Sequence, residues 1–354
     1  MNCSLDNGDF SLKNITFPDH LNFSIIEYNI DRNGFGGDSP LEKGLQNIID
    51  LFKASVLITP DFLILSEIAR DCKSYGNYID GAFEIAKSLN LYYVYGVEYI
   101  LDEDTNDTIN HQCTIGNAIM SKYKLDNPNF LRFERQCCKF YGRTGGRLAI
   151  MASLKVDSDH ELVIYSTHLE SGTGVKDLTQ AIGARFTQTK EIIKHSNDLN
   201  GNYMSFEELE KIKERINRTE VLEQYKQGNA FRIKEYEELM KLTENLNKTI
   251  IIAGDLNTPL DKIDLAVDEL LFNTFVDGHQ KLSYFERNTC PFDELSKFGL
   301  FVYDYVFMKS ARFQFSNPKV LNKDYNEKCY GASDHYPIMV NILENSKTFQ
   351  VKIE

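Results

Sequence analysis

Short apolar runs alternate with polar segments over most of this chain. The apolar runs are rich in β-branched and aromatic residues, which is the composition typical of β-strands. We therefore predict strands over 23–30, 61–68, 92–100, 115–121, 147–156, 161–169, 248–257, 301–308 and 336–343. Two intervening stretches, 39–55 and 77–90, have the spacing of amphipathic helices. Strands that alternate with helices in some places and follow one another directly in others predict an α/β fold with mixed sheets.

One long segment, residues 204–246, is highly charged and has no strand pattern. Ser205 and Glu208 have the spacing of a capping box, and apolar residues then recur at helical intervals. We predict a pair of helices inserted between two core strands. The second helix would carry its apolar stripe at Tyr236, Leu239, Met240 and Leu246. The many charges favour a solvated flap over an element that binds a partner.

The charge balance limits the kinds of partner. The 354 residues include 52 acidic and 39 basic side chains, for a formal net charge of -13. This balance argues against a broad basic surface for nucleic acid. It leaves room for a local basic strip, and five cations precede the strand at 161–169: Arg132, Arg135, Lys139, Arg143 and Arg147. The strip can either follow a phosphate backbone or belong to a solvated loop whose charges are balanced by acidic neighbours.

The seven cysteines are scattered and follow no metal-binding spacing, so we predict reduced thiols. The N-terminus lacks the charged start and apolar core of a secretory signal. No apolar run approaches the roughly 18 residues that a membrane-spanning helix needs. We therefore expect an intracellular protein with no transmembrane segment, while the exact compartment and the oligomeric state stay open.

Polar residues occupy strand ends where a hydrophobic core does not accommodate them. They are Asn29, Glu67, His168, Asp255, Asn257 and Asp304, together with the run from Ser333 to His335. An ionised group in such a place costs several kcal/mol unless a partner or a metal compensates. Each residue alone can be a turn, a cap or a structural histidine. Together they are hard to explain in that way, and they indicate a catalytic edge formed by strand ends.

The order of these residues resembles the endonuclease/exonuclease/phosphatase superfamily, whose DNase I-like members include nucleases and phosphatases. The matching stretches are Asn29, Glu67, "GNAIMS" (116–121), "THLES" (167–171), "GDLN" (254–257), "DYVF" (304–307) and "SDH" (333–335). The resemblance implies a four-layer sandwich, in which two mixed β-sheets pack face to face and helices cover the outside. It covers residues 20–345 as one domain, with 204–246 as a helical insertion and 1–19 as an N-terminal extension.

The resemblance also implies a metal site. Glu67 matches the metal-binding glutamate, Asn29 an asparagine that helps to hold the metal, and Asp334 a carboxylate that can reach it. Oxygen ligands of this kind suit Mg²⁺ or Mn²⁺ rather than zinc. Asp31 occupies the place of a second acidic ligand in DNA-repair members. Ser66 departs from the usual glutamine before the metal glutamate, which puts one outer hydrogen bond in doubt.

Catalytic roles follow from the same match. Asp255 matches the aspartate that activates the attacking water, and Asn257 the asparagine that orients the water or the phosphate. His168 matches a histidine that hydrogen-bonds the phosphate. Asp304 matches the aspartate that orients the last histidine, His335. These residues imply hydrolysis of a phosphoester by activated water.

The expected substrate is a nucleic-acid or nucleotide phosphodiester. One alternative is a phosphoesterase that acts on inositol phosphates or sphingomyelin, and another is a catalytically inactive scaffold with the same fold. The complete set of site residues argues against the scaffold. The absence of tryptophan and the continuation after "GDLNTP" argue against the inositol phosphatase branch. Neither a phosphate-binding P-loop nor a serine-hydrolase motif competes.

Overall fold

We describe the protein from a computed structural model of the whole chain. The described residues are 5–8, 21–34, 44–53, 60–72, 78–101, 113–133, 143–170, 219–244, 248–257, 274–282, 284–287, 289, 302–321, 333 and 335–345. The statements below concern these residues, and side chains at 5–8, 33–34, 143–144, 219–229 and 284–285 are left aside.

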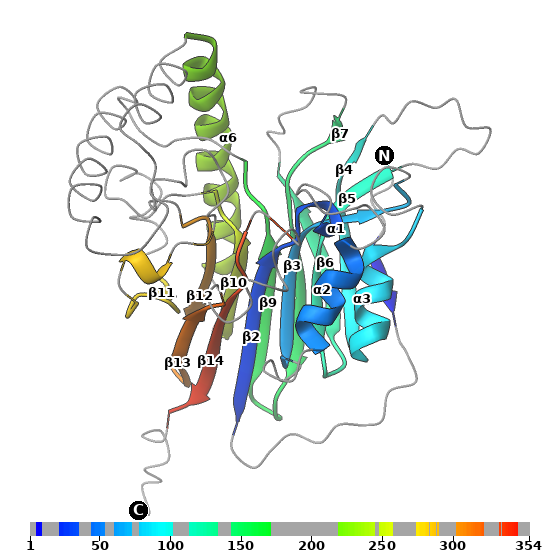
Figure 1. Cartoon of the computed structure of the whole chain (residues 1–354). Helices are drawn as coiled ribbons and strands as arrows, with labels where there is room; N and C mark the ends of the chain where they lie inside the picture. The colour runs from blue at the N-terminus through cyan, green and yellow to red at the C-terminus, as the bar shows by residue number, and fades with distance from the viewer. Residues whose placement is uncertain are drawn as a thin grey trace, which may run out of the picture.

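The described strands form two mixed sheets (Figure 1). Sheet A contains, in spatial order, β1 (Leu5–Gly8), β4 (Tyr92–Leu101), β5 (Cys113–Ser121), β3 (Phe62–Arg70), β2 (Asn22–Asn29), β14 (Ile338–Glu344) and β13 (Phe313–Val320), while β7 (Arg143–Gly145) also pairs with β4. Sheet B contains β11 (Val276–Asp277), β12 (Asp304–Lys309), β10 (Thr249–Asp255), β9 (Glu161–Thr167), β8 (Leu148–Lys155) and β6 (Asp126–Arg132). The parallel pairs are β2–β3 and β10–β9, and the other neighbours are antiparallel.

The two sheets pack face to face around a hydrophobic core. Every second residue of a strand points to the same face, so Phe23 and Ile25 of β2 meet Ile251 and Ala253 of β10 in one cluster of buried side chains. All four are fully buried. The same inward positions continue along β2 to Glu27 and Asn29, and along β10 to Asp255. The core therefore ends in polar side chains at one end of the sandwich.

Helices cover the outer face of each sheet. Helix α2 (Gly44–Lys53) and helix α3 (Gly81–Leu89) pack on sheet A, as Figure 1 shows. Helix α3 begins at Asp80, whose carboxylate accepts from the amide of Phe83 at 3.0 Å, and ends at Asn90 in the left-handed conformation. Helix α6 (Thr219–Thr243) packs on sheet B. The layers are therefore helix, sheet, sheet and helix, which confirms the predicted four-layer sandwich.

Helix α6 corrects the prediction of a solvated flap. Its Tyr236, Leu239 and Met240 are buried against the outer face of sheet B, where they contact Val163 and Ile252 within one cluster. The charged sequence hid this packing, since one apolar stripe is enough to seat an otherwise polar helix. The first predicted helix of the segment lies outside the described residues. The bounds of the insertion and of the 20–345 domain stay predictions.

All nine predicted strands are present, with ends that differ by a few residues. The sequence did not reveal β6 and β13, which carry Pro128 and Pro318. Both strands lie at sheet edges, and each pairing contains a register shift. Proline is tolerated at such edges because its missing N–H then costs no inner-sheet hydrogen bond. Residues 5–8 of the predicted N-terminal extension form β1, next to β4.

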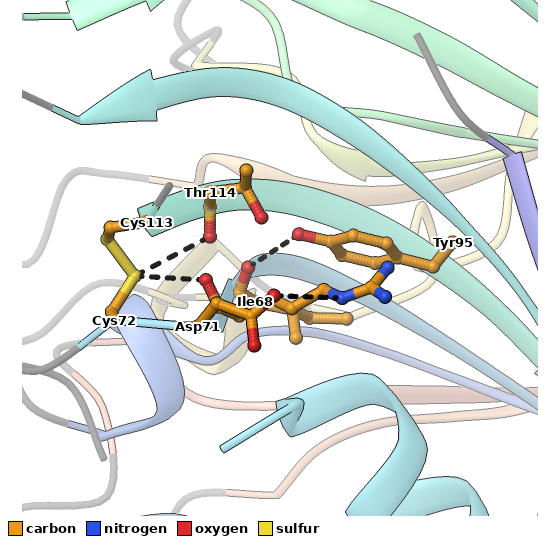
Figure 2. Close-up of a disulfide and its surroundings, with 7 residues drawn as sticks. Ile68, Asp71, Cys72, Tyr95, Cys113 and Thr114 are labelled. Carbon is orange, nitrogen blue, oxygen red and sulfur yellow. Dashed lines mark hydrogen bonds and ion pairs between the residues drawn. A yellow bond between two sulfur atoms is a disulfide. The ribbon is translucent and has the colours of Figure 1, made fainter. Parts of the chain in front are cut away.

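One disulfide contradicts the prediction that every cysteine is a reduced thiol. Cys72 and Cys113 are bonded, with 4.3 Å between their Cα atoms, and they join the end of β3 to the start of β5 (Figure 2). The Cys72 sulfur also lies 3.3 Å from the carbonyl oxygen of Arg70. Sequence spacing could not reveal this pair, because the antiparallel β3–β5 pairing brings together residues 41 positions apart. The cysteine argument for an intracellular protein no longer holds, and the compartment stays a prediction.

Within the described part of the chain, no helix combines the length and the apolar character that crossing a membrane requires.

Candidate active site

Asp255 stands at the centre of the polar end of the sandwich. It is the last residue of β10, after an apolar run that drives the strand into the core. Gly254 precedes it at φ +145°, and a Cβ there would lie 1.8 Å from the carbonyl oxygen of Thr167. Only glycine therefore allows β10 to approach the end of β9 this closely. The parallel pairing of β9 with β10 then brings His168 next to Asp255.

Three side chains from three separate segments face one oxygen of Asp255. Asn29 Nδ2 donates to Oδ2 at 3.0 Å, His168 Nε2 lies 3.6 Å from it, and His335 Nε2 lies 3.8 Å from it. The other oxygen, Oδ1, accepts from the backbone amide of Asn257 at 2.8 Å. Asp255 is 2% exposed. The structure thus joins four of the predicted site residues around a single carboxylate.

Asp304 lies beside His335, the histidine with which the resemblance pairs it. The antiparallel register of β10 and β12 puts Asp304 opposite Asp255, and Asp304 Oδ2 accepts from His335 Nδ1 at 2.8 Å. Ser333 fixes the approach of this segment, because its hydroxyl donates to the carbonyl of Asn29 at 2.6 Å. The same hydroxyl oxygen accepts from the amide of His335 at 3.1 Å. This segment is therefore tied to the end of β2.

Glu67 lies within β3 rather than after it. The register between β3 and β5 shifts between Leu65 and Ile68, and Glu67 there has φ +57°. Such a bulge turns a side chain out of the regular alternation. Glu67 Oε1 lies 3.8 Å from His168 Nδ1, and Oε2 lies 3.8 Å from Arg32 Nε. Burial raises the pKa of Glu67, whereas the nearby basic groups, His168 when protonated and then Arg32, Arg147 and His335, lower it, and the net direction is downward.

The carboxylates near the site repel one another. Burial raises the pKa of Asp255, the two histidines lower it and Asp304 raises it, with a net upward shift. Glu27, two residues before Asn29 on the inward face of β2, is fully buried. Burial and the negative charges of Asp304 and Asp255 raise the pKa of Glu27 well above its ordinary value. A cation at this end of the sandwich would relieve the repulsion, so the donor set fits a divalent metal.

Two buried charged residues, Glu98 and Arg147, lie at the site although the sequence did not place them there; Arg147 was predicted only as part of the basic strip. Arg147 Nη1 lies 2.7 Å from His168 Nδ1 and 3.2 Å from Glu98 Oε2. Glu98 occupies a bulge of β4, where the register with β5 shifts between Val97 and Tyr99. The available signal was a charge within each of two apolar strand patterns, "YYVYGVEYI" and "RLAIMASL". Glu27 in "FSIIEYNI" carried the same signal.

The loops after β9 and β10 are held together and anchored to helix α6. Asn257 Nδ2 donates to the carbonyl of Leu169 at 2.8 Å, so the side-chain amide of Asn257 joins the loop after β10 to the loop after β9. Arg232 donates to the carbonyl of Asn257. Glu235, one turn later, accepts from the amide of Glu170 at 2.7 Å. Both helix side chains are buried, with exposures of 0% and 1%. The helix that was predicted as a flap therefore supports both loops.

Seven of the eight predicted site residues are described, and the contacts above connect them. They are Asn29, Glu67, His168, Asp255, Asn257, Asp304 and His335. Asp334 lies outside the described residues. Asp31 is buried beside the site, and its amide donates to Asn29 Oδ1 at 3.0 Å. The roles assigned to all these residues stay proposals.

The predicted basic strip is not supported at its described arginines. Arg132 donates to the carbonyls of Glu98 and Gly146, both at 2.8 Å. Arg147 is 6% exposed and points to Glu98 and His168. Arg143 lies in β7, but its side chain is not described, and Arg135 and Lys139 lie outside the described residues. The two inward-facing guanidinium groups compensate buried oxygens, so they do not form a surface for a phosphate backbone.

Among the described residues, one group of potential metal ligands has all its ligand atoms within 4.8 Å of one another: Asp255, Asp304 and His335. This set differs from the set implied by the resemblance, Asn29, Glu67 and Asp334. A cation held by the first set would compete with the 2.8 Å hydrogen bond between Asp304 and His335. The Glu67 carboxylate, 17% exposed and held by ion pairs of 3.8 Å, is open to a cation without that loss.

The sandwich of two mixed sheets, with its polar site at one end, is the fold of the endonuclease/exonuclease/phosphatase proteins. A protein of that family from Beutenbergia cavernae DSM 12333 gives a TM-score of 0.55 at 15% identity, over 92% of this chain and 72% of that one. The human Nocturnin catalytic domain with bound sulfate gives 0.54 at 14% identity, over 92% and 94%. D. rerio TDP2 complexed with a single strand DNA product gives 0.50 at 15% identity, over 91% and 98%.

No protein-family profile matches the sequence, and no curated protein matches it. At identities of 14% and 15%, the structural likenesses establish the fold. The reaction is therefore argued from the site.

Proposed function

We propose that this protein is a metal-dependent phosphoesterase that hydrolyses a phosphodiester by attack of an activated water. The observation that carries the proposal is the convergence of Asn29, His168 and His335 on Asp255 Oδ2, at 3.0, 3.6 and 3.8 Å. A carboxylate between two imidazoles can take a proton from water while the imidazoles stabilise charge on a phosphoryl oxygen. The likeness in fold to Nocturnin and TDP2 supports this class of reaction at the level of the superfamily.

In this proposal, each side chain around Asp255 has a separate role in the hydrolysis. Asp255 is the base, and its raised pKa brings a carboxylate nearer to the pH at which it exchanges protons effectively. Asp304 accepts the Nδ1–H of His335, which fixes the ring and leaves Nε2 facing the site. His168 supplies a second imidazole from the loop after β9. Asn29 holds Asp255 in place through its amide.

A divalent cation fits the oxygen donors of Glu67, Asn29 and Asp334, and Mg²⁺ or Mn²⁺ is the proposed metal. When bound, such a cation supplies Lewis-acid stabilisation of the phosphoryl charge. Asn29 already uses Nδ2 for Asp255 and Oδ1 for the amide of Asp31, so Glu67 is the principal ligand of the described set. The lowered pKa of Glu67 keeps this carboxylate ionised and ready for a cation.

For the substrate, we propose a nucleic-acid or nucleotide phosphodiester. The support is the likeness in fold to a TDP2 structure with a single strand DNA product. The predicted basic strip does not support this substrate, because Arg132 and Arg147 face inward. The test compares single-stranded DNA, poly(A) RNA, sphingomyelin and an inositol polyphosphate with Mg²⁺ present. Cleavage of either nucleic acid supports the proposal, whereas phosphate release from the inositol compound alone overturns the substrate class.

Metal dependence is tested with the same substrates. Activity should disappear in EDTA and return with Mg²⁺ or Mn²⁺, and Glu67→Gln should raise the metal concentration needed for half-maximal activity. Full activity in EDTA would contradict the metal. A folded protein that cleaves none of the four substrates with either metal would favour the inactive scaffold.

A further inference from the structure

We propose that Arg147 is a positioning residue that fixes the tautomer of His168, so that this histidine presents its Nε2–H to the site around Asp255. The inference deepens the proposed function, on which it rests only for the identity of the group that receives the N–H. It gives a role to a buried arginine that the proposed reaction does not use.

The contact between Arg147 and His168 defines which ring nitrogen carries hydrogen. Nη1 of Arg147 lies 2.7 Å from Nδ1 of His168. A guanidinium has only donors and keeps its charge in proteins. Nδ1 must therefore accept, and in the neutral ring the hydrogen is then on Nε2.

The Nε2 side of the ring faces the reacting end of the site. It lies 3.6 Å from Asp255 Oδ2, the oxygen that also has Asn29 and His335 around it. A hydrogen at Nε2 points a donor at the place where the proposed phosphoester oxygen would sit. The opposite tautomer would turn a lone pair toward the acidic oxygen of Asp255, which repels it. The arginine thus acts through His168, without touching the substrate.

The chain holds Arg147 in place by a local feature of the fold. Residues 146–147 lead from β7 in sheet A to β8 in sheet B, and Gly145 has φ +127°. A Cβ at Gly145 would lie 2.6 Å from the carbonyl oxygen of Glu98. This close approach puts Arg147 beside the Glu98 carboxylate, 3.2 Å away, with Glu170 at 3.9 Å. The carboxylates compensate the buried cation and restrict its rotation.

The groups around His168 have opposite effects on whether its Nδ1 carries a hydrogen. The Arg147 guanidinium, 2.7 Å from Nδ1, disfavours a hydrogen on that nitrogen, whereas the carboxylates of Glu98 and Glu67, at 3.6 and 3.8 Å, favour one. A proton on both ring nitrogens would set two N–H donors against each other across the 2.7 Å contact. The position of Arg147 therefore fits a neutral His168 ring, with hydrogen on Nε2 alone. The NMR measurement described below distinguishes this form from a ring that carries hydrogen on both nitrogens.

The competing interpretation is that Arg147 and Glu98 form a buried ion pair that only stabilises the fold. Loss of activity in an Arg147 variant cannot separate the two, because an unpaired Glu98 would disturb the core. The tautomer of His168 can separate them. Without the guanidinium, Glu98 Oε2 at 3.6 Å becomes the nearest partner of Nδ1 and favours a hydrogen there.

The experiment is a long-range ¹H–¹⁵N correlation spectrum of the full chain labelled with ¹⁵N-histidine, in EDTA and at one neutral pH. His168→Gln assigns the resonances. We expect the wild type to carry its hydrogen on Nε2, Arg147→Met to shift it to Nδ1, and Arg147→Lys to keep it on Nε2. Arg70→Met is the matched control, because Arg70 pairs with Asp71 and Asp80 elsewhere on sheet A, and His168 should not change.

Steady-state kinetics with Mg²⁺ give the second readout. Arg147→Met should lower kcat at least about tenfold with a smaller change in KM, since a donor to the transition state is lost. Arg147→Lys should restore much of kcat. If Arg147→Met does not fold, the wild-type spectrum and Glu98→Gln, which keeps the guanidinium and should keep the Nε2–H form, still test the proposal.

Hydrogen on Nδ1, or on both nitrogens, in the wild type would overturn the inference. An Nε2–H form that persists in Arg147→Met would overturn it too. The spectrum requires neither substrate nor metal, so its outcome is independent of the proposed reaction. The expected tautomers in a protein that cleaves no phosphoester would support the inference and contradict the proposed function.

Discussion

Glu235 of helix α6 accepts a hydrogen bond at 2.7 Å from the backbone amide of Glu170, two residues after the candidate phosphate-binding histidine. The two residues are 65 positions apart, and Glu235 is 1% exposed. The loop carrying His168 therefore depends for its position on a helix that, from its sequence, resembles a dispensable surface element.

Removing this acceptor should destabilise the protein and loosen the loop. Glu235→Ala leaves a buried N–H without its partner, at a cost of about 1–3 kcal/mol in the free energy of unfolding. We expect a lower Tm by thermal unfolding and a lower kcat, while Glu235→Gln, which keeps an acceptor oxygen, should retain kcat and should not lower Tm. Glu237→Gln is the control, because Glu237 on the same helix pairs with Lys234 and its side chain is 40% exposed. An unchanged Tm in Glu235→Ala would contradict the anchoring role.

The same carboxyl group should make stability depend on pH. Burial raises the pKa of Glu235 from 4.5 to about 8. Above pH 4.5 the unfolded chain ionises this group while the folded protein keeps it neutral, so its contribution to stability is lost as pH rises toward 8. Glu235→Gln cannot ionise, and its Tm should exceed that of the wild type by at least about 2 °C near pH 8, the shift that about 1 kcal/mol produces in a large domain. The two Tm values should converge near pH 4.5. If Tm instead changes with pH in the same way in the wild type and in Glu235→Gln, the pKa of Glu235 is not raised in the folded protein.

The acidic centre should be more important for turnover than for folding. Asp255→Asn and His335→Ala should each lower kcat by at least about a hundredfold, the scale of losing a general base or a key hydrogen-bond donor. The Tm of Asp255→Asn should hold or rise, because burial and Asp304 disfavour the Asp255 charge. Thermal unfolding in EDTA and kinetics with Mg²⁺ measure the two effects separately. A collapse of Tm together with activity would identify Asp255 as structural.

The disulfide between Cys72 and Cys113 should be a substantial source of stability. It closes a loop across 41 positions, for which the chain-entropy model gives about 4 kcal/mol. Cys113→Ser should therefore lower Tm by roughly 8 °C or more. Reduction under denaturing conditions should also expose two additional reactive thiols, compared with the denatured unreduced wild type. No gain of thiols on reduction would mean that the pair is not bonded.

Much of this fold can be predicted from the alternation of apolar and polar residues. The strands that carry Asn29, His168, Asp255 and Asp304 are strongly apolar, so a polar residue at their ends is conspicuous. Their shared position at one end of the sandwich follows from the pairing of β9 with β10 and of β10 with β12. The packing of helix α6 could not be predicted, since a charged helix with one apolar stripe fits a flap and a packed layer equally well.

The buried charges were not predictable for a different reason. Glu98 reaches the site through a bulge in β4, and a bulge shifts the facing of every later residue in its strand. In the sequence, Glu98 within an alternating run has the pattern of a solvent-facing residue. Arg147 becomes a partner of His168 only when the chain crosses from one sheet to the other. Such pairings depend on three-dimensional register, which local patterns do not specify.

The hydrogen bond from Ser333 to the carbonyl of Asn29 joins residues 304 positions apart. Strand β14 lies directly beside β2, so every residue between them must be synthesised before the two can pair. A chain emerging from the ribosome therefore exposes Asn29, Glu67 and His168 for most of its synthesis without its last histidine. Because pairing between distant segments closes late and slowly, the proposed activity should appear only after β14 has been made and has paired with β2, and shorter nascent chains should not hydrolyse phosphoesters.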